Sequence, residues 1–252
     1  RPPRSTLFPY TTLFRSDAIE IIFLSFKQGF KRLAYWIRPN IWTFFLSITI
    51  LLAPASKAGL YTAVAEGLRD PGESRTIPRI GFRRGFFENL GRSLLLALLN
   101  GLILMFILAS ILFWTYQDDL IFNLLSIPGF YFLAYWWLCQ PFLFPALIEN
   151  RGLTILAVYK HVVVLVFPAP LFSFNITLLN TLLTVVGIAL LGPILFVIPA
   201  LIAIISTQAY WHLRGDLLPE WGDPVLYQQR LDQREKNQNI DQNHQLSKKG
   251  TL

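Results

Sequence analysis

Residues 162–211 contain no Asp, Glu, Lys or Arg and are divided once, by Gly192-Pro193. In water, a run of this kind would have to be buried on every side. At about 1.5 Å per residue it supplies two helices of about 20 residues, each long enough to cross the hydrocarbon core of a bilayer. We therefore interpret it as a transmembrane hairpin whose two spans are residues 171–191 and 194–211.

Composition places the whole chain among membrane proteins. Hydrophobic residues make up 54% and charged residues 15% of its 252 residues, whereas soluble domains carry about 25% charged residues. The single cysteine, Cys139, excludes an intrachain disulfide framework and a Cys-rich zinc or iron–sulfur site. We expect an all-α, polytopic transmembrane helical bundle of about five spans.

The first sixteen residues do not fit this description. Residues 6–16, TLFPYTTLFRS, resemble the conceptual translation of a sequencing adapter, and the only methionine is Met105. We expect residues 1–16 to be a non-native, adapter-derived segment and the native part to begin near Asp17. Without the three arginines of this segment the formal net charge falls from +7 to +4, which is too small to indicate a nucleic-acid partner.

Residues 17–38 are predicted to form an amphipathic helix that lies in the membrane interface. A helix packed on the protein's own cytoplasmic side is the alternative. The transmembrane helical domain then covers residues 39–214, and residues 215–252 are expected to be a polar cytoplasmic tail, largely disordered. The predicted apolar face of the amphipathic helix consists of Ile19, Ile22, Phe23, Phe26, Phe30, Leu33 and Ile37.

The first hydrophobic segment is short. Pro39 is expected to start a helix, because its missing N–H matters least there. The chain then stays apolar only as far as Pro54, and about 14 residues reach only some 21 Å. Either the segment continues through Val64 as a crossing kinked at Pro54, or it turns back as a re-entrant element.

The order of the following segments resembles the YesL-like family of bacterial integral membrane proteins. The likeness rests on residues 54–61, PASKAGLY, and on residues 82–91, FRRGFFENLG, which end a predicted loop over residues 69–93. It implies a small multi-span protein of the bacterial cytoplasmic (inner) membrane, often associated with carbohydrate uptake and without an established activity. Lys57 departs from the family, in which a small or hydroxyl residue is more usual.

Basic residues predict how the chain is threaded, because Lys and Arg concentrate in cytoplasmic loops. Seven lie between the first and second spans, two in the connection after the third span, and six in the C-terminal tail; the turns at Asp118-Asp119 and Gly192 have none. The tail is therefore predicted to be cytoplasmic. Four further basic residues precede the first span. With five spans, which is the working count, these four residues lie outside the cell membrane. With four spans and a re-entrant segment, they lie on the cytoplasmic side.

Five small polar residues share one face of the predicted helix over residues 171–191. Polar groups are unfavourable in lipid unless paired, so we expect this polar stripe to face the interior of the bundle. Hydrogen-bonded helix packing is the simpler interpretation. A polar substrate path that includes Asn100 and Gln140 is the alternative. The stripe consists of Ser173, Thr177, Asn180, Thr181 and Thr184.

No motif indicates catalysis. The chain lacks a metalloprotease, hydrolase, Walker or dinucleotide-binding pattern. Its three histidines, at positions 161, 212 and 244, are too scattered for a metal site. Glu149 is expected to be solvated or paired with Arg151. We therefore expect no enzymatic activity, no cofactor and no bound metal.

Two functions fit these observations. The first is a non-enzymatic accessory or scaffold protein, linked by the resemblance to carbohydrate uptake, with the lipid bilayer and a membrane transport complex or a second copy of the chain as its partners. The second is a small transporter or channel subunit with a polar path along the fourth span.

Overall fold

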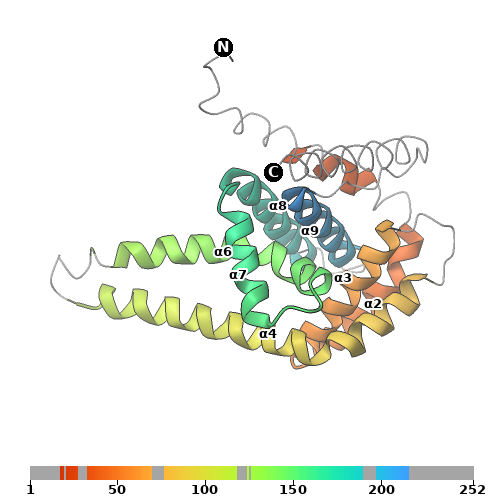
Figure 1. Cartoon of the computed structure of the whole chain (residues 1–252), viewed down its shortest axis with the longest axis horizontal. Coiled ribbons are helices and arrows are strands. Elements are labelled where there is room, and N and C mark those ends of the chain that lie inside the picture. The colour runs from red at the N-terminus through yellow and green to blue at the C-terminus, as the bar shows by residue number, and fades with distance from the viewer. Residues whose placement is uncertain are drawn as a thin grey trace, which may run out of the picture.

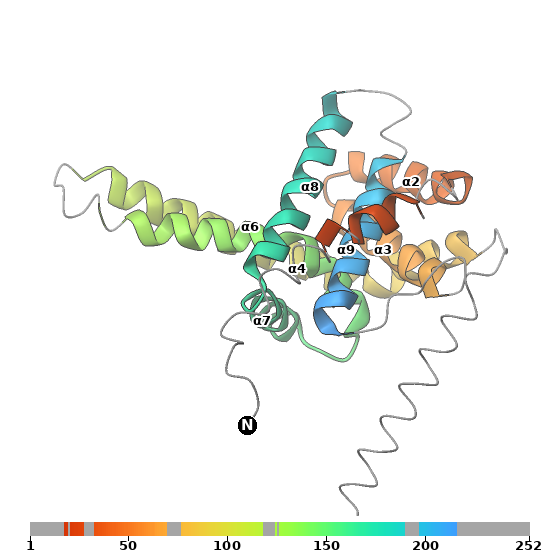
Figure 2. The ribbon, with the colours of Figure 1, turned by 90° about the horizontal axis from the view of Figure 1, so that it is seen from above.

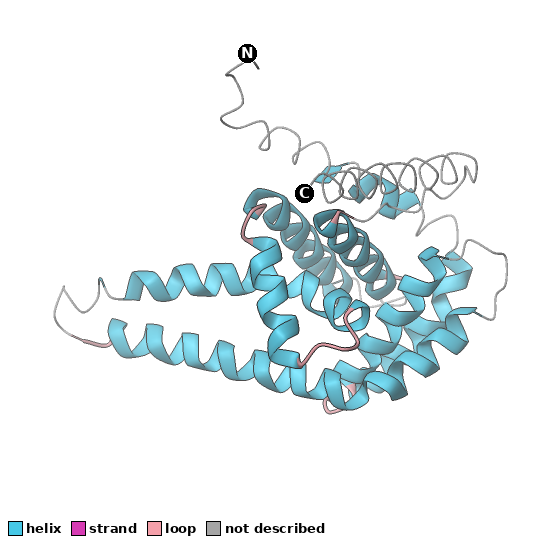
Figure 3. Cartoon of the chain, viewed as in Figure 1, coloured by secondary structure: helices cyan, strands magenta, loops and turns pink. Residues whose placement is uncertain are grey.

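The computed structural model describes residues 18–19, 21–27, 33–69, 77–117, 124, 126–189 and 197–215. Within these ranges all regular structure is helical and no strand is present (Figure 3), which confirms the predicted all-α class. The predicted adapter-derived segment and nearly all of the predicted tail lie outside the described residues. The helices are α2 (Leu33–Ile48), α3 (Ala53–Arg69), α4 (Ile77–Thr115), α6 (Ser126–Glu149), α7 (Ile155–Val166), α8 (Pro170–Ala189) and α9 (Ile198–Arg214).

Three of the described helices, α4, α6 and α8, are long and apolar enough to cross a membrane. In their most apolar stretches only 11%, 44% and 33% of the residues, respectively, are buried inside the protein. In a soluble protein the remaining apolar side chains would form large patches in contact with water, which is unfavourable. Hydrocarbon surroundings suit these surfaces, in agreement with the predicted membrane protein.

Helices α4 and α6 form an arm. They run side by side, and the end of α4 and the start of α6 project away from the other helices (Figure 1). Helix α8 runs across the direction of this arm rather than along it (Figure 2). Helix α8 therefore crosses the arm instead of lying along it, and α8 and the arm can both span a bilayer only if their tilts differ.

The first hydrophobic segment is broken into two short helices. Residues 49–52 separate α2 from α3, and the hydroxyl oxygens of Ser47 and Ser56 lie 3.0 Å apart across this turn. With 16 and 17 residues, the two helices lie at or just below the lower limit of the roughly 17–25 residues that a crossing uses. Pro54 lies in the first turn of α3, where its missing N–H is tolerated. The predicted helix start at Pro39 is wrong, because α2 already begins at Leu33.

Helix α4 begins much earlier than predicted. The sequence indicated a loop over residues 69–93, but α4 starts at Ile77 and contains residues 82–91. Glycines bring α4 close to α3: a Cβ added at Gly85 would lie 2.3 Å from Thr62 Oγ1. Packing against α3 therefore extends the helix through a stretch whose glycines alone would not favour it.

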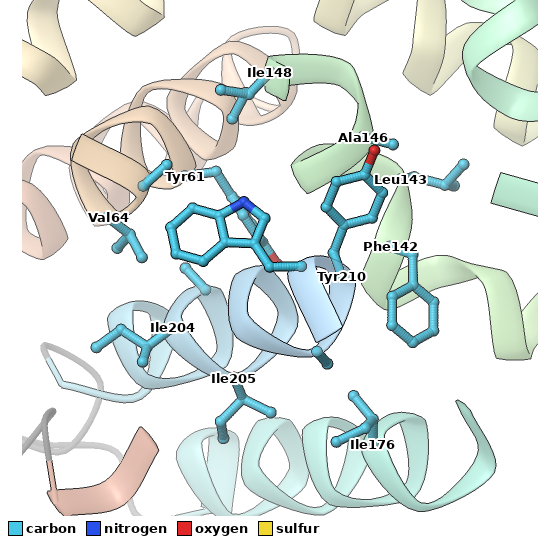
Figure 4. Close-up of a cluster of buried hydrophobic side chains, with 14 of the residues drawn as sticks. Tyr61, Val64, Phe142, Leu143, Ala146, Ile148, Ile176, Ile204, Ile205 and Tyr210 are labelled. Atoms are coloured by element: carbon cyan, nitrogen blue, oxygen red, sulfur yellow. The ribbon is translucent and has the colours of Figure 1, made fainter. Parts of the chain in front are cut away.

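Helix α9 lies at the centre of the protein. It packs against α2, α3, α6, α7 and α8, and most of its residues are buried. Figure 4 shows Ile205 and Tyr210 of α9 among apolar side chains of α3, α6 and α8. Gly215 ends the helix with φ 79°, in the left-handed region that favours glycine. The second helix of the predicted hairpin is therefore largely enclosed by protein.

The predicted amphipathic helix of residues 17–38 is described only in part. Among residues 18–27 the buried side chains include Ile21 and Ser25, and Ser25 donates a hydrogen bond to Gln208 Oε1 of α9 at 2.5 Å. Ile19 and Phe23, on the predicted apolar face, are exposed. The segment thus docks on α9 and turns large apolar side chains outward. Its position at the membrane interface stays a prediction.

Candidate functional site

The predicted polar stripe lies on α8. Ser173, Thr177 and Asn180 are buried, whereas Thr181 and Thr184 are exposed. The hydroxyls of the three threonines donate to carbonyl oxygens four residues earlier in α8, at 2.7, 2.8 and 2.8 Å. The threonines therefore offer their oxygen lone pairs, and not their protons, to any further partner.

Contacts between helices use only part of this stripe. Asn180 Nδ2 donates to Ser206 Oγ of α9 at 2.9 Å, a contact of the kind that the packing interpretation requires. Asn180 Oδ1 is buried and has no hydrogen-bond partner in the described part of the chain. A buried acceptor without a partner is unfavourable by about 1–3 kcal/mol. Packing alone therefore does not account for the Asn180 side chain.

A cavity of about 440 Å³, which we call the polar cavity, lies beside the stripe. Apolar and aromatic side chains from α2, α3, α6 and α9 form much of its wall. Its size falls in the range of small-molecule sites, roughly 300–1,000 Å³. Its polar lining includes Thr177, Asn180, Thr181 and Thr184 from α8, Gln140 from α6 and Ser206 from α9. Ser173 is not part of the described lining.

Lys57 of α3 is the only charged residue in the described lining of the polar cavity. Its Nζ atom lies 6.0 Å from the centre of the Phe144 ring, within reach of a cation–π contact. It forms no ion pair within the described part of the chain. Lys57 is exposed, and an ionisable residue in an apolar membrane segment is a candidate for a binding site. In the sequence, Lys57 stands out as a departure from the family pattern. A single lysine in an apolar segment is also a signal that could have indicated a binding site.

Asn100 and Gln140, the predicted further members of a polar path, bind to each other. Asn100 Nδ2 donates to Gln140 Oε1 at 2.9 Å, and Asn100 Oδ1 accepts from Trp136 Nε1 at 2.9 Å and from the Tyr159 hydroxyl at 3.2 Å. Burial raises the pKa of Tyr159 to about 12, so this hydroxyl keeps its proton. Gln140 belongs to the described lining and Asn100 does not. Asn100 therefore positions Gln140.

Charged side chains gather where α3, α6 and α9 end. Glu149 has a side chain only 6% exposed and accepts from Arg69 Nη2 at 2.5 Å and from Trp211 Nε1 at 3.2 Å. Arg151 instead pairs with Glu88 of α4 at 3.0 Å. Both predictions for Glu149, solvation and a pair with Arg151, are wrong because the packing of α9 against α6 encloses the carboxylate.

The remaining candidate residues do not form a reactive group. Cys139 is buried in α6, and His161 Nε2 lies 3.2 Å from the Tyr210 hydroxyl of α9. Asp118 and Asp119 lie outside the described residues. Among the side chains that the structure describes, no three His, Cys, Asp or Glu residues come together in a group that could hold a metal.

No protein-family model, curated protein or solved structure matches this chain. The YesL-like resemblance therefore stays a prediction that rests on residues 54–61 and 82–91. These two segments meet in the structure: a Cβ added at Gly59 would lie 2.9 Å from the carbonyl oxygen of Phe82. The residues that carry the resemblance thus form part of the contact between α3 and α4.

Proposed function

We propose that this protein is a polytopic membrane protein whose polar cavity binds a small organic anion rich in hydroxyl groups, as part of a small transporter or channel. The meeting of Lys57 with the polar stripe in one cavity carries this proposal. Lys57 supplies positive charge, and Asn180 Oδ1 supplies a buried acceptor that lacks a partner. Sugar acids combine a carboxylate with hydroxyl donors and suit a cavity of about 440 Å³.

We further propose four crossings, by α4, α6, α8 and α9, with α2 and α3 as a re-entrant pair. With 17 residues α9 is at the lower limit for a crossing, but it is surrounded by other helices and not by lipid alone. The contact of Ser25 with Gln208 supports this threading, because it joins the segment before α2 to the second half of α9. The pairing of Arg69 with Glu149 joins the ends of α3 and α6, which both this threading and five crossings place on one side. Under the positive-inside rule, the side of the membrane on which these helix ends lie is the cytoplasmic side, and the C-terminus lies there too. The membrane of this proposal is a bacterial inner membrane. Five spans is the alternative.

A non-enzymatic accessory role in carbohydrate uptake is the second proposal. Besides the resemblance, the exposed apolar surface of the arm supports it, because such a surface packs against another membrane helix as readily as against lipid. Gly101 of α4, for example, has no atom within 4 Å of an added Cβ. The partner would be a membrane transport complex or a second copy of the chain.

Binding is tested with the full chain reconstituted in lipid nanodiscs. Glucuronate and glucose serve as probes, because they differ mainly in the carboxylate. We expect glucuronate to bind more tightly. Lys57→Met should weaken glucuronate binding by about 10- to 100-fold, because a hydrogen bond to a charged group contributes about 1.5–3 kcal/mol. Glucose binding should change little.

Lys160→Met is the matched control, because Lys160 is exposed on α7 and lies outside the described lining of the polar cavity. Equal binding of the two probes to the unmodified chain would contradict the proposal, as would equal effects of the two lysine substitutions. Asn180→Leu with Thr181→Val separates the two interpretations of the stripe. Normal folding with lost binding favours a site, and lost folding favours packing. Retrieval of a sugar-transport complex without probe binding favours the accessory role.

A further inference from the structure

A second cavity, of about 620 Å³, lies between α2 and the first part of α4. Three arginines and several apolar side chains line it, and no acidic residue belongs to its described lining. We call it the arginine cavity. It shares no described lining residue with the polar cavity, so the two sites are independent. The lining residues that matter here are Arg38, Trp42 and Leu46 of α2 and Arg79, Arg83 and Phe87 of α4.

The two helices present cationic and apolar side chains in the same order. In each helix three lining residues follow one another at steps of four, which places them along one face. The arginines come first and the apolar residues follow. Beyond Phe87, α4 continues into its lipid-exposed apolar stretch. Measured along α4, the arginine end of the cavity therefore lies farther from the hydrocarbon core than the apolar end does.

The arginines of this cavity differ from their neighbour in having no acidic partner. Arg84, next to Arg83 on α4, forms an ion pair with Glu66. No ion pair involves Arg38, Arg79 or Arg83 within the described part of the chain. Like charges brought together repel one another unless an anion lies between them. The cavity therefore has the charge of an anion site.

We infer that the arginine cavity binds one anionic phospholipid of the surrounding bilayer, with the phosphate at the arginines and an acyl chain along the apolar residues. Guanidinium groups bind phosphate oxygens in a bidentate manner. Trp42 and Phe87 are 56% and 66% exposed and can contact a lipid chain, and an indole suits the level of the headgroups. A soluble anion would use only the arginines and leave the apolar part of the cavity without an occupant.

Native mass spectrometry of the full chain tests this inference. The protein is purified in detergent with an equal mixture of phosphatidylglycerol and phosphatidylcholine. We expect the unmodified chain to retain phosphatidylglycerol about tenfold more often than phosphatidylcholine. Arg83→Gln should reduce this preference several-fold. Arg84→Gln removes the same charge at the adjacent position, outside the described cavity lining, and should leave the preference unchanged.

Four results would overturn the inference. The first is equal retention of the two lipids by the unmodified chain, a measurement that needs no variant. The second is an equal loss of the preference for phosphatidylglycerol in Arg83→Gln and Arg84→Gln. This result would mean that the lipid is attracted by the overall positive charge of the protein and not by this cavity. The third is displacement of the lipid by inorganic phosphate, which would identify a site for a free anion.

Phe87→Ser should weaken retention of phosphatidylglycerol without changing the net charge. Unchanged retention in this variant, the fourth result, would also count against the lipid.

Discussion

At the scale of single residues, Arg92 has a different task from the arginines of the arginine cavity. Its guanidinium donates to the carbonyl oxygens of Leu147, Asn150 and Leu153 at 3.4, 3.0 and 3.0 Å. These groups lie in the last turn of α6 and in the connection that follows, where a helix leaves its final carbonyls without partners. Arg92 therefore fastens the connection between α6 and α7 to α4.

Arg92→Lys is expected to lower the free energy of unfolding by about 1–3 kcal/mol. An ammonium group lacks the planar fork of guanidinium, so at least one of the three carbonyls loses its partner. Thermal unfolding in detergent, followed by tryptophan fluorescence, measures the change. Arg151→Lys is the control, because its ion pair with Glu88 is exposed and contributes at most about 1 kcal/mol. Equal losses in the two variants would contradict this role of Arg92.

The residues of the polar cavity were only partly predictable. The period of the α-helix alone placed the five residues of the stripe on one face, because that property is local. Lys57 and Asn180 line one cavity only because α3 and α8 both pack against α9, which no local pattern encodes. The pair of Arg69 and Glu149 has the same origin, since 80 positions separate its members.

At the scale of elements, the contact between α3 and α4 is built on glycines. A Cβ added at Gly59, Gly81 or Gly85 would lie 2.9, 2.6 or 2.3 Å, respectively, from an atom of the facing helix. Close approach of backbones is the usual way for membrane helices to associate, because lipid removes the hydrophobic driving force between them. The ion pair of Arg84 with Glu66 joins the same two helices.

Gly85→Ala is expected to destabilise the protein by about 1–3 kcal/mol, because the added methyl group overlaps with Thr62. Gly101→Ala, in the same helix, is the control: its Cβ meets nothing within 4 Å, so the better helix propensity of alanine should make it neutral or slightly stabilising. Adding Thr62→Gly to Gly85→Ala should restore part of the loss. Thermal unfolding of the four variants, including Thr62→Gly alone, shows whether the two positions are coupled.

Helix lengths were predicted well where only apolar content decides them. The span predicted over residues 171–191 corresponds to α8, with a shift of one or two residues at each end. The exact position of the break, at residues 49–52, and the early start of α4 were not predicted. Both depend on how α2, α3 and α4 pack against one another, and a single segment does not contain that information.

At the scale of the whole molecule, side chains far apart in the sequence meet where several helices end. Arg69, Glu149 and Trp211 come from α3, α6 and α9, and Arg151 reaches Glu88 of α4. Both the re-entrant threading and five crossings place these helix ends on one side of the membrane. Charge alone left the side of the first segment open, because its four basic residues and its length favoured opposite threadings.

Single cysteines in a Cys139→Ala background test the threading. A membrane-impermeant maleimide applied to intact bacterial cells should label Tyr116→Cys, at a position where the native side chain is 90% exposed at the end of the arm. Lys27→Cys and Arg151→Cys should react only after the membrane is permeabilised, because basic segments stay in the cytoplasm. Labelling of Lys27→Cys together with Tyr116→Cys on intact cells would contradict the re-entrant pair and establish five crossings.

The enclosed position of α9 has a consequence for synthesis of the protein. A ribosome synthesises α3 and α6 before α9. The central helix is therefore the last of the described helices to leave the ribosome. Until then the inner faces of α3 and α6 are covered by lipid or by each other. Insertion must end with a helix entering between helices already in the membrane. A nascent chain stopped before Ile198 leaves these faces without α9, so we expect membrane proteases to degrade it faster than the full chain.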